Sequence, residues 1–499
     1  MKYSLSLCGL AALAAQCTCQ DLPPVTTEEL QALISLDDLV AGAEQLQAFA
    51  DADPDGNRAF GGEGHNATVD YLFDTLNATG YYNVTRQEFV ELFSAASGSL
   101  TIDDEEIEIG FFTYTPSGNA SAPLVAVAEL GCSSDDFPEN STDAIVLISR
   151  GECTFAEKAS NALTAGAVGA IIYNNIEDQI ASGTLGGVGD YVPVVGITLE
   201  DGESFLALLE AGTNVTAELE VSAILENRTT FNVIAETLGG DHDNVIAAGA
   251  HTDSVFEGPG INDDGSGTIG ILTTALALTN FTVTNAVRWC FWSAEEFGLL
   301  GSTYYVSQLN QTASEIAKIR AYLNFDMIAS PNYYLAIYDG DGSTFNLSGP
   351  PGSAEIEWDF QAFYLDQGVN YSASAFDGRS DYGPFLENNI PAGGLFTGAE
   401  DLKTEEEELA YGGTAGEAYD DNYHKVGDNI TNLDLDAWFL NTKSIANSIA
   451  LYATGGGLDR FPPVTAPSVK RHWQPSVRKA KRAVAHQGHS HCGSEDLAI

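Results

Sequence analysis

Histidine and acidic residues follow three apolar runs in the C-terminal half of the chain. The runs are VIAAGA at 245–250, NAVRWCFWSA at 285–294 and AYLNF at 321–325. The residues that follow them are His251, Asp263, Glu295, Glu296 and Asp326. His424 lies in a later polar segment, DDNYHKVGDN. Imidazole nitrogen and carboxylate oxygen are the ligands of open zinc sites, so these residue types predict a metal centre.

The number of these side chains matches a centre with two metal ions. Two ions about 3.5–4 Å apart need one carboxylate that bridges them. One histidine and one acidic residue for each ion, together with a bridging aspartate, make five protein ligands. The sequence offers this set as His251, Asp263, Glu296, Asp326 and His424.

Glu295 and Asp253 have supporting roles in this scheme. Adjacent residues of an extended segment point apart, so Glu295 and Glu296 are not expected to bind the same ion. One of the pair is then a ligand, and the other is the general base that takes a proton from the bridging water. Asp253, which stands two residues beyond His251, is placed to orient the imidazole of His251.

Each of these residues also has a simpler interpretation. A Glu-Glu pair at the start of a helix interacts with the helix dipole, and an Asn-Asp-Asp-Gly stretch commonly forms a turn. Asp326 can bond to a loop, and a single histidine at a strand end is usually not a ligand. His65, in an earlier loop, is expected at the surface and not as a ligand. The joint occurrence of the other residues at successive strand ends favours the metal centre.

Strands and helices alternate around these residues. Strands are expected over 244–251, 285–294 and 321–328, with helices over 267–280 and 297–312 between them. Near-continuous apolar strands that alternate with helices indicate an α/β fold, with a mixed and largely parallel sheet sandwiched by helices. Sites in such folds lie beyond the carboxyl ends of the strands, which is where the candidate ligands stand.

The chain divides into five segments that differ in composition and in expected secondary structure. A lysine, an apolar run and small residues predict a secretory signal peptide at 1–19. Residues 20–111 begin with helical patterning, and residues 112–225 carry short strands around one helix, which indicates an inserted α+β unit. Residues 226–458 hold the candidate site. Residues 459–499 are rich in proline and then basic, and we expect this tail to be disordered.

The chain is strongly acidic. Its 20 basic and 71 acidic residues give a net charge of −51, which argues against a nucleic-acid partner and against docking on anionic lipid. No apolar run after the signal peptide reaches the roughly 18 residues of a transmembrane helix. We expect a monomeric, secreted extracellular protein, with the vacuole as the alternative destination.

Twelve Asn-x-Ser/Thr sequons accompany the signal peptide. In a secreted chain they predict a glycoprotein. The sequons begin at Asn66, Asn77, Asn83, Asn119, Asn140, Asn214, Asn227, Asn280, Asn310, Asn346, Asn370 and Asn429.

The cysteines predict one disulfide bond. Cys132 and Cys153 are close in sequence and are expected to pair in an oxidising compartment. Cys290 lies in an apolar run and is expected to be a buried free thiol. No Cys-x-x-Cys pair exists, which argues against a zinc site of thiolates. The tail residues that could form a weak, adventitious metal site are His486, His489, His491 and Cys492.

Several segments together resemble the co-catalytic dizinc aminopeptidases, the metallopeptidase family that includes aminopeptidase Y and secreted leucine aminopeptidases. The matching segments are HTDS, GPGINDDGSG, SAEEFGLLGS, NFDM, GRSDYGPF and YHKVGDN, with NRAFGGEGH near the N-terminus. The segment DAIVLISRGECTFAEKASNALTAGAVGAIIYNN resembles a protease-associated (PA) domain inserted into the peptidase. Fungal secreted or vacuolar leucine aminopeptidases share this layout, and the resemblance implies a zinc-exopeptidase fold.

The resemblance assigns a role to each candidate residue. It implies that His251 and Asp326 hold one zinc ion, that Glu296 and His424 hold the other, and that Asp263 bridges the two. It implies that Glu295 is the general acid and base, that Tyr423 hydrogen-bonds the tetrahedral oxyanion and that Arg379 binds substrate. It also implies a cis peptide bond between Asp263 and Asp264.

The sequence thus predicts a secreted aminopeptidase with two zinc ions. Its substrates are expected to be peptides with a free N-terminus, and the resemblance implies a preference for large apolar N-terminal residues such as leucine. Three alternatives stay open. They are a carboxypeptidase or dipeptidase on the same fold, a non-catalytic protein that binds through its PA domain, and a single-zinc acyltransferase similar to glutaminyl cyclases.

Overall fold

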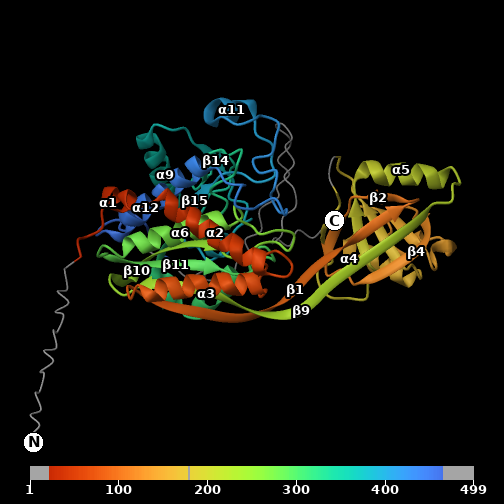
Figure 1. Cartoon of the computed structure of the whole chain (residues 1–499), viewed down its shortest axis with the longest axis horizontal. Coiled ribbons are helices and arrows are strands. Elements are labelled where there is room, and N and C mark those ends of the chain that lie inside the picture. Colours follow the sequence, from red (N-terminus) through yellow and green to blue (C-terminus); the bar gives the residue numbers. More distant parts are fainter. Residues whose placement is uncertain (1–21, 178–179, 463, 465–499) are drawn as a thin grey trace, which may run out of the picture.

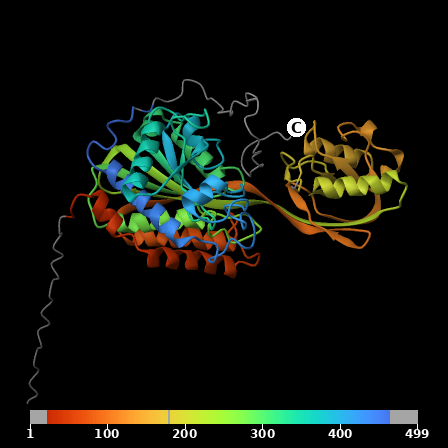
Figure 2. The same ribbon diagram turned by 90° about the horizontal axis from the view of Figure 1, so that it is seen from above.

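The computed structural model describes residues 22–177, 180–462 and 464. A larger body of helices around a sheet is joined to a smaller body by a long two-stranded ribbon (Figures 1 and 2). The predicted signal peptide lies outside the described residues. So does the tail from residue 465 onward, which carries His486, His489, His491 and Cys492.

The strands of the larger body form one mixed sheet in the order β14-β13-β15-β12-β10-β11-β9. Neighbours among β10, β11, β12 and β15 are parallel. Strand β9 is antiparallel to β11, and β13 is antiparallel to β15 but parallel to β14. The bounds are β9 (Thr216–Thr237), β10 (Asp241–His251), β11 (Asn285–Trp292), β12 (Ile319–Phe325), β13 (Ala336–Tyr338), β14 (Ser372–Ser374) and β15 (Ala392–Phe396). The sequence-based expectation of a largely parallel, mixed sheet is confirmed.

Helices cover both faces of this sheet, which explains why its strands are apolar along their whole length. In β10, Ile246 and Ala248 pack into one core, and Ala247 packs into the core on the other face. The first face carries α1 (Thr27–Ala32), α2 (Leu36–Ala52), α3 (Glu63–Ala78), α6 (Gly265–Leu278), α9 (Ser353–Gln367) and α12 (Leu435–Ala453). The second face carries α7 (Leu300–Leu309), α8 (Ala313–Lys318) and α10 (Gly383–Glu387).

The ribbon consists of β9 and β1 (Tyr82–Ile102), which pair antiparallel from Tyr82↔Thr237 to Ile102↔Ala217. Near one end, Tyr82 and Val233 pack into the core of the larger body. Near the other end, Leu100 and Leu219 pack into a core of the smaller body. The chain therefore leaves the larger body within β1, before the predicted boundary at residue 111, and returns to it within β9.

The smaller body has parallel strands β4, β5, β6 and β8 beside the ribbon. Its strands are β2 (Glu105–Ile107), β3 (Gly110–Thr113), β4 (Gly118–Ala126), β5 (Ile145–Ser149), β6 (Gly169–Tyr173), β7 (Gly183–Thr184) and β8 (Val194–Ile197). Its helices are η1 (Ser134–Asp136), η2 (Glu139–Ser141), α4 (Phe155–Thr164) and α5 (Leu199–Glu210). Cys132 and Cys153 form a disulfide with Cα atoms 5.6 Å apart, and Cys290 is a buried free thiol, as predicted.

A short acidic helix, α11 (Glu405–Tyr411), stands out from the larger body near its edge (Figure 1). Thr404 caps it and Glu407 returns the capping bond, a common start of a helix. Among the described helices, none combines the length and the apolar character that crossing a bilayer would require.

Candidate metal centre

The five predicted ligands lie beyond the carboxyl ends of neighbouring strands. His251 is the last residue of β10, Glu296 follows β11 and Asp326 directly follows β12. Asp263 precedes α6, and His424 lies in the loop between α11 and α12. Because β11, β10 and β12 are adjacent and parallel, their ends bring these side chains to one place.

Asp263 lies between the two histidines. Its Oδ1 is 3.1 Å from Nε2 of His251, and its Oδ2 is 3.2 Å from Nε2 of His424. One carboxylate therefore faces both imidazoles with different oxygens. This is the arrangement expected of a residue that bridges two metal ions.

Each histidine also faces a carboxylate of its own. Oδ1 of Asp326 lies 3.5 Å from Nε2 of His251, and Oε2 of Glu296 lies 3.0 Å from Nε2 of His424. The five side chains thus form two sets that share Asp263. This is the division that the resemblance implies.

Asp264 is close to the candidate ligands, but its carboxylate accepts hydrogen bonds from backbone N–H groups. Its Oδ2 accepts a hydrogen bond from the backbone N–H of His251, and its Oδ1 accepts bonds from the N–H groups of Gly267 and Met327. Asp264 therefore caps α6 and ties β10 to the end of β12. The peptide bond between Asp263 and Asp264 is cis, as predicted.

The side chains of the centre fit a bound metal ion. Oε1 of Glu296 is buried and makes no hydrogen bond with the described part of the chain, which costs free energy unless another partner is bound there. Two imidazoles with three carboxylates form the kind of ligand set that zinc takes in catalytic sites.

Burial and the neighbouring charges shift the pKa values of the side chains in the centre. Burial raises the pKa of Glu296 to about 7, and Asp263 adds to the effect. Burial opposes the charged form of His251, but Asp326 and Glu295 outweigh it and raise the pKa of His251 well above its usual value. Binding of metal ions by these side chains would therefore displace protons.

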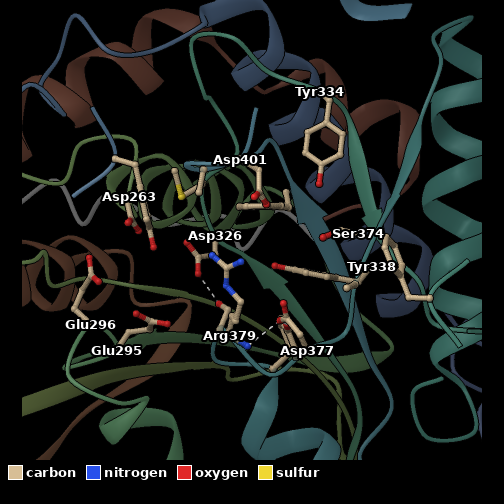
Figure 3. Close-up of a pocket in the computed structure, with 18 residues that line it drawn as sticks. Asp263, Glu295, Glu296, Asp326, Tyr334, Tyr338, Ser374, Asp377, Arg379 and Asp401 are labelled. Carbon is tan, nitrogen blue, oxygen red and sulfur yellow. Dashed lines mark hydrogen bonds between the residues drawn. The ribbon is translucent and has the colours of Figure 1, made fainter. Parts of the chain in front are cut away.

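Glu295 faces the centre without being placed as a ligand. Its Oε2 is 3.9 Å from Nε2 of His251, and burial raises its pKa well above the usual range. The preceding Ala294 has φ of 59°, a left-handed conformation that is uncommon for alanine. Glu295 lines the pocket together with Glu296 (Figure 3). The position suits the predicted general base.

Asp253 supports His251 in a different way from the one predicted. Nδ1 of His251 is 3.2 Å from the backbone oxygen of Asp253, whereas the Asp253 carboxylate is 3.8 Å from Nδ1. Oδ1 of Asp253 accepts a hydrogen bond of 3.1 Å from the backbone N–H of Glu295. The carboxylate thus fixes the segment that carries Glu295, and the carbonyl orients the imidazole.

A cavity of about 190 Å³ opens beside the centre. The carboxylates of Asp263, Glu295, Glu296 and Asp326 form one end, and Tyr338 and Ser374 lie toward the other (Figure 3). The aromatic residues of the lining are Tyr334, Tyr338, Phe345, Tyr382, Phe396 and Tyr423. Such a lining suits an apolar side chain held next to the reacting groups.

Arg379 and Tyr423, predicted to contact substrate, both line this cavity. Nη2 of Arg379 is 3.3 Å from Oε1 of Glu400, so the guanidinium is already in an ion pair. The ring of Tyr423 stacks on that of His424 with centroids 3.8 Å apart. Burial raises the pKa of Tyr423 well above its usual value, so its hydroxyl stays protonated and is a donor.

The structure corrects the expectation for His65. This histidine is fully buried, and its Nε2 lies 3.0 Å from Oγ1 of Thr252. It is not at the surface, because α3 begins in the glycine-rich loop and carries His65 inward against the end of β10. Burial, with Arg58 and His251, lowers the pKa of His65 to about 3, so the ring is neutral.

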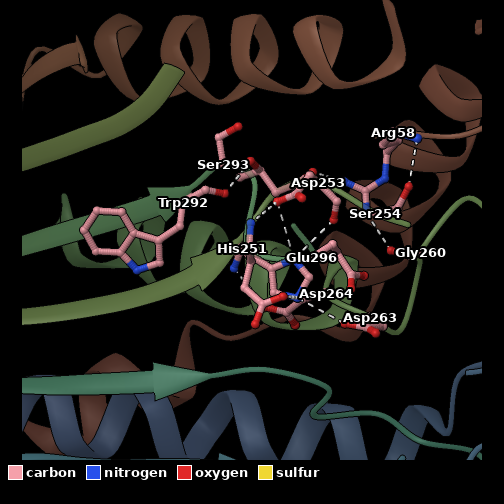
Figure 4. Close-up of polar contacts among 12 residues, drawn as sticks. Arg58, His251, Asp253, Ser254, Gly260, Asp263, Asp264, Trp292, Ser293 and Glu296 are labelled. Carbon is pink, nitrogen blue, oxygen red and sulfur yellow. Dashed lines mark hydrogen bonds and ion pairs between the residues drawn. The ribbon is translucent and has the colours of Figure 1, made fainter. Parts of the chain in front are cut away.

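Three residues that support the ligands were not singled out from the sequence. Ser380 donates to Oδ2 of Asp326, and the carboxylate of Asp428 accepts bonds from the N–H groups of Asn262 and Asp263. Both lie inside segments that carry the resemblance, GRSDYGPF and YHKVGDN. Arg58, in NRAFGGEGH, is the third and bonds to the loop that follows His251, beside Gly260 (Figure 4).

Residues 232–449 match peptidase family M28, and residues 120–205 match the PA domain. A probable leucine aminopeptidase 2 from Aspergillus fumigatus is 52% identical over 475 residues, which cover 94% of this chain and 93% of that protein. The chain belongs to peptidase family M28. Leucine aminopeptidase 2 from Trichophyton equinum is 52% identical over 433 residues and covers 86% of this chain and 87% of its own.

Solved structures of similar enzymes have the same fold. An aminopeptidase from Aneurinibacillus sp. strain AM-1 has a TM-score of 0.65 at 28% identity and covers 88% of this chain and 98% of its own. A zinc aminopeptidase from Bacillus subtilis has a TM-score of 0.60 at 26% identity, with 85% and 95% covered. The predicted family, the fold and the inserted PA domain are confirmed, and this M28 enzyme is a metallo-aminopeptidase.

Proposed function

We propose that this M28 enzyme is a secreted dizinc aminopeptidase that removes large apolar residues, leucine above all, from peptide N-termini. The placement of Asp263 carries the proposal of two ions. Its two oxygens face His251 and His424 at 3.1 and 3.2 Å, and each histidine has a carboxylate of its own. The names of the similar leucine aminopeptidases and the aromatic lining of the cavity support the preference for leucine. The similar zinc aminopeptidase supports zinc as the metal.

Glu295 is the general base and then the general acid of the proposed reaction. Zinc, when bound, polarises the scissile carbonyl and lowers the pKa of the attacking water. Glu295 accepts a proton from that water as its oxygen bonds to the carbonyl carbon. Glu295 then delivers the proton to the leaving nitrogen as the carbon–nitrogen bond breaks. Tyr423 donates a hydrogen bond to the oxygen that gains negative charge.

The charge of the cavity favours a substrate amine over a substrate carboxylate. Among the described residues of the lining, Arg379 is the only basic one, and Glu400 already pairs with it. Asp377 and Asp401 line the cavity in addition to the carboxylates of the metal centre. A carboxypeptidase would need a free cation for the substrate's terminal carboxylate, and this lining offers none. A free N-terminal ammonium group fits it.

Purified enzyme with leucine p-nitroanilide tests the proposal. We expect turnover of this substrate, none of its N-acetyl form, and loss of turnover in Glu295→Gln and after chelation. Metal analysis should give two zinc ions per chain. Turnover of the acetylated form at an equal rate would exclude the exopeptidase assignment, and a single zinc per chain would exclude the two-metal centre.

Secretion and glycosylation form a separate part of the proposal. The side chains of nine sequon asparagines are exposed. These are Asn77, Asn83, Asn119, Asn140, Asn214, Asn227, Asn280, Asn346 and Asn370. Asn66, Asn310 and Asn429 are partly buried, and the amide of Asn310 donates to Asn388. Glycopeptide mass spectrometry of protein from the culture medium should find sugar mainly on the exposed group.

A further inference from the structure

The loop at residues 252–262 joins two ligands of the metal centre. His251 ends β10 before the loop, and Asp263 follows it at the entrance to α6. The distance between a histidine ligand and the shared carboxylate therefore depends on how this loop closes. Loops without regular secondary structure need other contacts to hold one conformation.

The side chain of Arg58 donates hydrogen bonds to both ends of this loop. Its Nε donates a hydrogen bond of 2.9 Å to the backbone oxygen of Pro259, and its Nη2 donates to that of Gly260. Its Nη1 donates to the backbone oxygen of Thr252, the residue next to His251. One planar guanidinium thus joins the first residue of the loop to two residues near its end. Figure 4 shows Arg58 beside Gly260.

The backbone beside Arg58 holds the middle of the loop. The backbone N–H of Arg58 donates a hydrogen bond of 2.9 Å to Oγ of Ser254. The backbone N–H of Ser254 donates one of 3.2 Å to the backbone oxygen of Arg58. The side-chain amide of Asn57 donates 2.8 Å to the oxygen of Phe256. Residues from the segment between α2 and α3 therefore bond to the loop from Thr252 to Gly260.

A positive charge at this depth needs compensation, and the centre supplies it. Arg58 is fully buried, and burying a charge without a partner is costly. Its hydrogen bonds go to neutral carbonyls, and its charge faces the carboxylates of Asp253, Asp428, Asp264 and Asp263 at longer range. Removal of the charge would leave this acidic group less compensated.

His65 completes the support without adding a second cation. Oγ1 of Thr252 donates 2.7 Å to the backbone oxygen of Trp292 at the end of β11. The hydroxyl proton is thus used, so Nε2 of His65 is the donor in its 3.0 Å contact with Thr252. The neutral ring of His65 joins the start of the loop to α3, and the Thr252 hydroxyl joins it to the end of β11.

We propose that Arg58 is a positioning residue of the metal centre, whose guanidinium joins the two ends of the 252–262 loop and so sets the distance between His251 and Asp263. The inference rests on the proposed two-metal centre, because a shared Asp263 makes this distance critical for both ions. Lysine cannot replace arginine here. An ammonium on a flexible stem keeps the charge, but it lacks the rigid fork that meets three carbonyls.

The test compares full-length Arg58→Lys and Arg58→Gln with wild type and with Arg320→Gln. Arg320 is a matched control, since its Nη2 also donates to two backbone oxygens, of Leu458 and Phe461, at the opposite end of the sheet. For each protein the measurements are zinc bound per chain over a range of buffered free zinc, the visible spectrum with cobalt, the melting temperature, kcat and KM.

We expect both Arg58 variants to bind zinc about 10- to 100-fold more weakly, the range typical of residues that support metal ligands. Their cobalt spectra should change, and kcat should fall with little change in KM, because Arg58 does not line the cavity. Arg320→Gln should lower the melting temperature but keep the wild-type zinc affinity and cobalt spectrum.

A wild-type zinc affinity and cobalt spectrum in Arg58→Lys would overturn the proposal. If that variant does not fold, Ser254→Ala removes one contact of the same support and keeps the buried charge. Weaker zinc binding by Ser254→Ala would then support the proposal, and unchanged binding would overturn it. The wild-type zinc count decides the two-metal proposal separately, since the role of Arg58 depends on the ratio of variant to wild-type affinity.

Discussion

The hydroxyl of Ser380 donates a hydrogen bond of 2.5 Å to Oδ2 of Asp326. This bond is the last of a buried series in which Trp292 donates to Tyr322, Tyr322 to Asn324 and Asn324 to Ser380. The other oxygen of Asp326 is thereby left facing His251 at 3.5 Å. A chain of donors that starts in β11 thus fixes the orientation of a carboxylate at the end of β12.

Ser380→Ala should weaken metal binding at the position shared by His251 and Asp326. Without its donor, Asp326 can rotate, and the loss expected for such a supporting group is about 10- to 100-fold in metal affinity. Zinc titration followed by turnover of leucine p-nitroanilide measures it. Ser444→Ala is the control, because the buried Ser444 hydroxyl makes no hydrogen bond to any residue that the structure describes. Equal zinc affinity in the two variants would refute this role of Ser380.

Metal removal should make the stability of the enzyme fall as the pH rises. In the metal-free chain, burial raises the pKa of Glu296 from 4.5, and that of Asp381 from 3.8, to about 7. Between the unfolded-state and the folded-state pKa values, the folded chain then binds more protons than the unfolded chain. The contribution of these two groups to stability is therefore fully present at the acidic end and is lost as the pH rises through 7.

Melting curves of chelated and zinc-loaded protein at pH 5.5 and pH 7.5, in buffers of about 0.15 M ionic strength to screen the surface charge, test this expectation. We expect the chelated protein to melt several degrees lower at the higher pH and the zinc-loaded protein to change much less. The zinc-loaded sample controls for repulsion within the acidic surface, which both samples share. A chelated protein that is more stable at pH 7.5 would contradict the assigned shifts.

Arg379→Met should raise the KM for leucine p-nitroanilide by about tenfold, or about 1.4 kcal/mol. The change removes a charged side chain from the cavity lining and breaks its ion pair with Glu400, in which Nη2 of Arg379 lies 3.3 Å from Oε1 of Glu400. The double variant with Glu400→Gln should recover part of the loss, since residues in contact are not additive. Steady-state kinetics of both single variants and the double variant measure the coupling. Strictly additive effects would show that the pair does not act as a unit.

Loss of the disulfide should destabilise the smaller body and spare the chemistry. Cys132 and Cys153 are 21 residues apart, and closing a loop of that size contributes about 3 kcal/mol. Calorimetry of Cys132→Ala/Cys153→Ala should show a transition at lower temperature, with unchanged zinc content and turnover at 25 °C. Loss of zinc from this variant would mean that the metal centre depends on the folded state of the smaller body.

The metal centre could be predicted because its residues stand at the ends of short-range patterns. The apolar runs that became β10, β11 and β12 are continuous in sequence, and the ligands directly follow them. The helical pattern after Asp264 likewise gave α6. For parallel neighbouring strands, the ends of these segments must meet at one edge, so local patterns were enough to gather His251, Glu296 and Asp326.

The support around the ligands could not be predicted in this way. Arg58 bonds to Pro259 across 201 residues, and no local pattern indicates such a contact. The glycine-rich segment around His65 suggested an exposed loop, but His65 lies in the first turn of α3 and tertiary packing buries it. The long strand β1 was also missed, since its burial does not alternate regularly. It is defined by its pairing with β9, more than a hundred residues later.

The ribbon makes the PA domain an insertion at a hairpin turn. The chain enters and leaves the smaller body at adjacent points, because Ile102 lies opposite Ala217. For the catalytic body, everything between these residues has the topology of one large loop, and the entropy of closing a loop rises only slowly with its length. The PA domain can therefore be gained, exchanged or lost in evolution without a change in the order or the connections of the strands in the catalytic body.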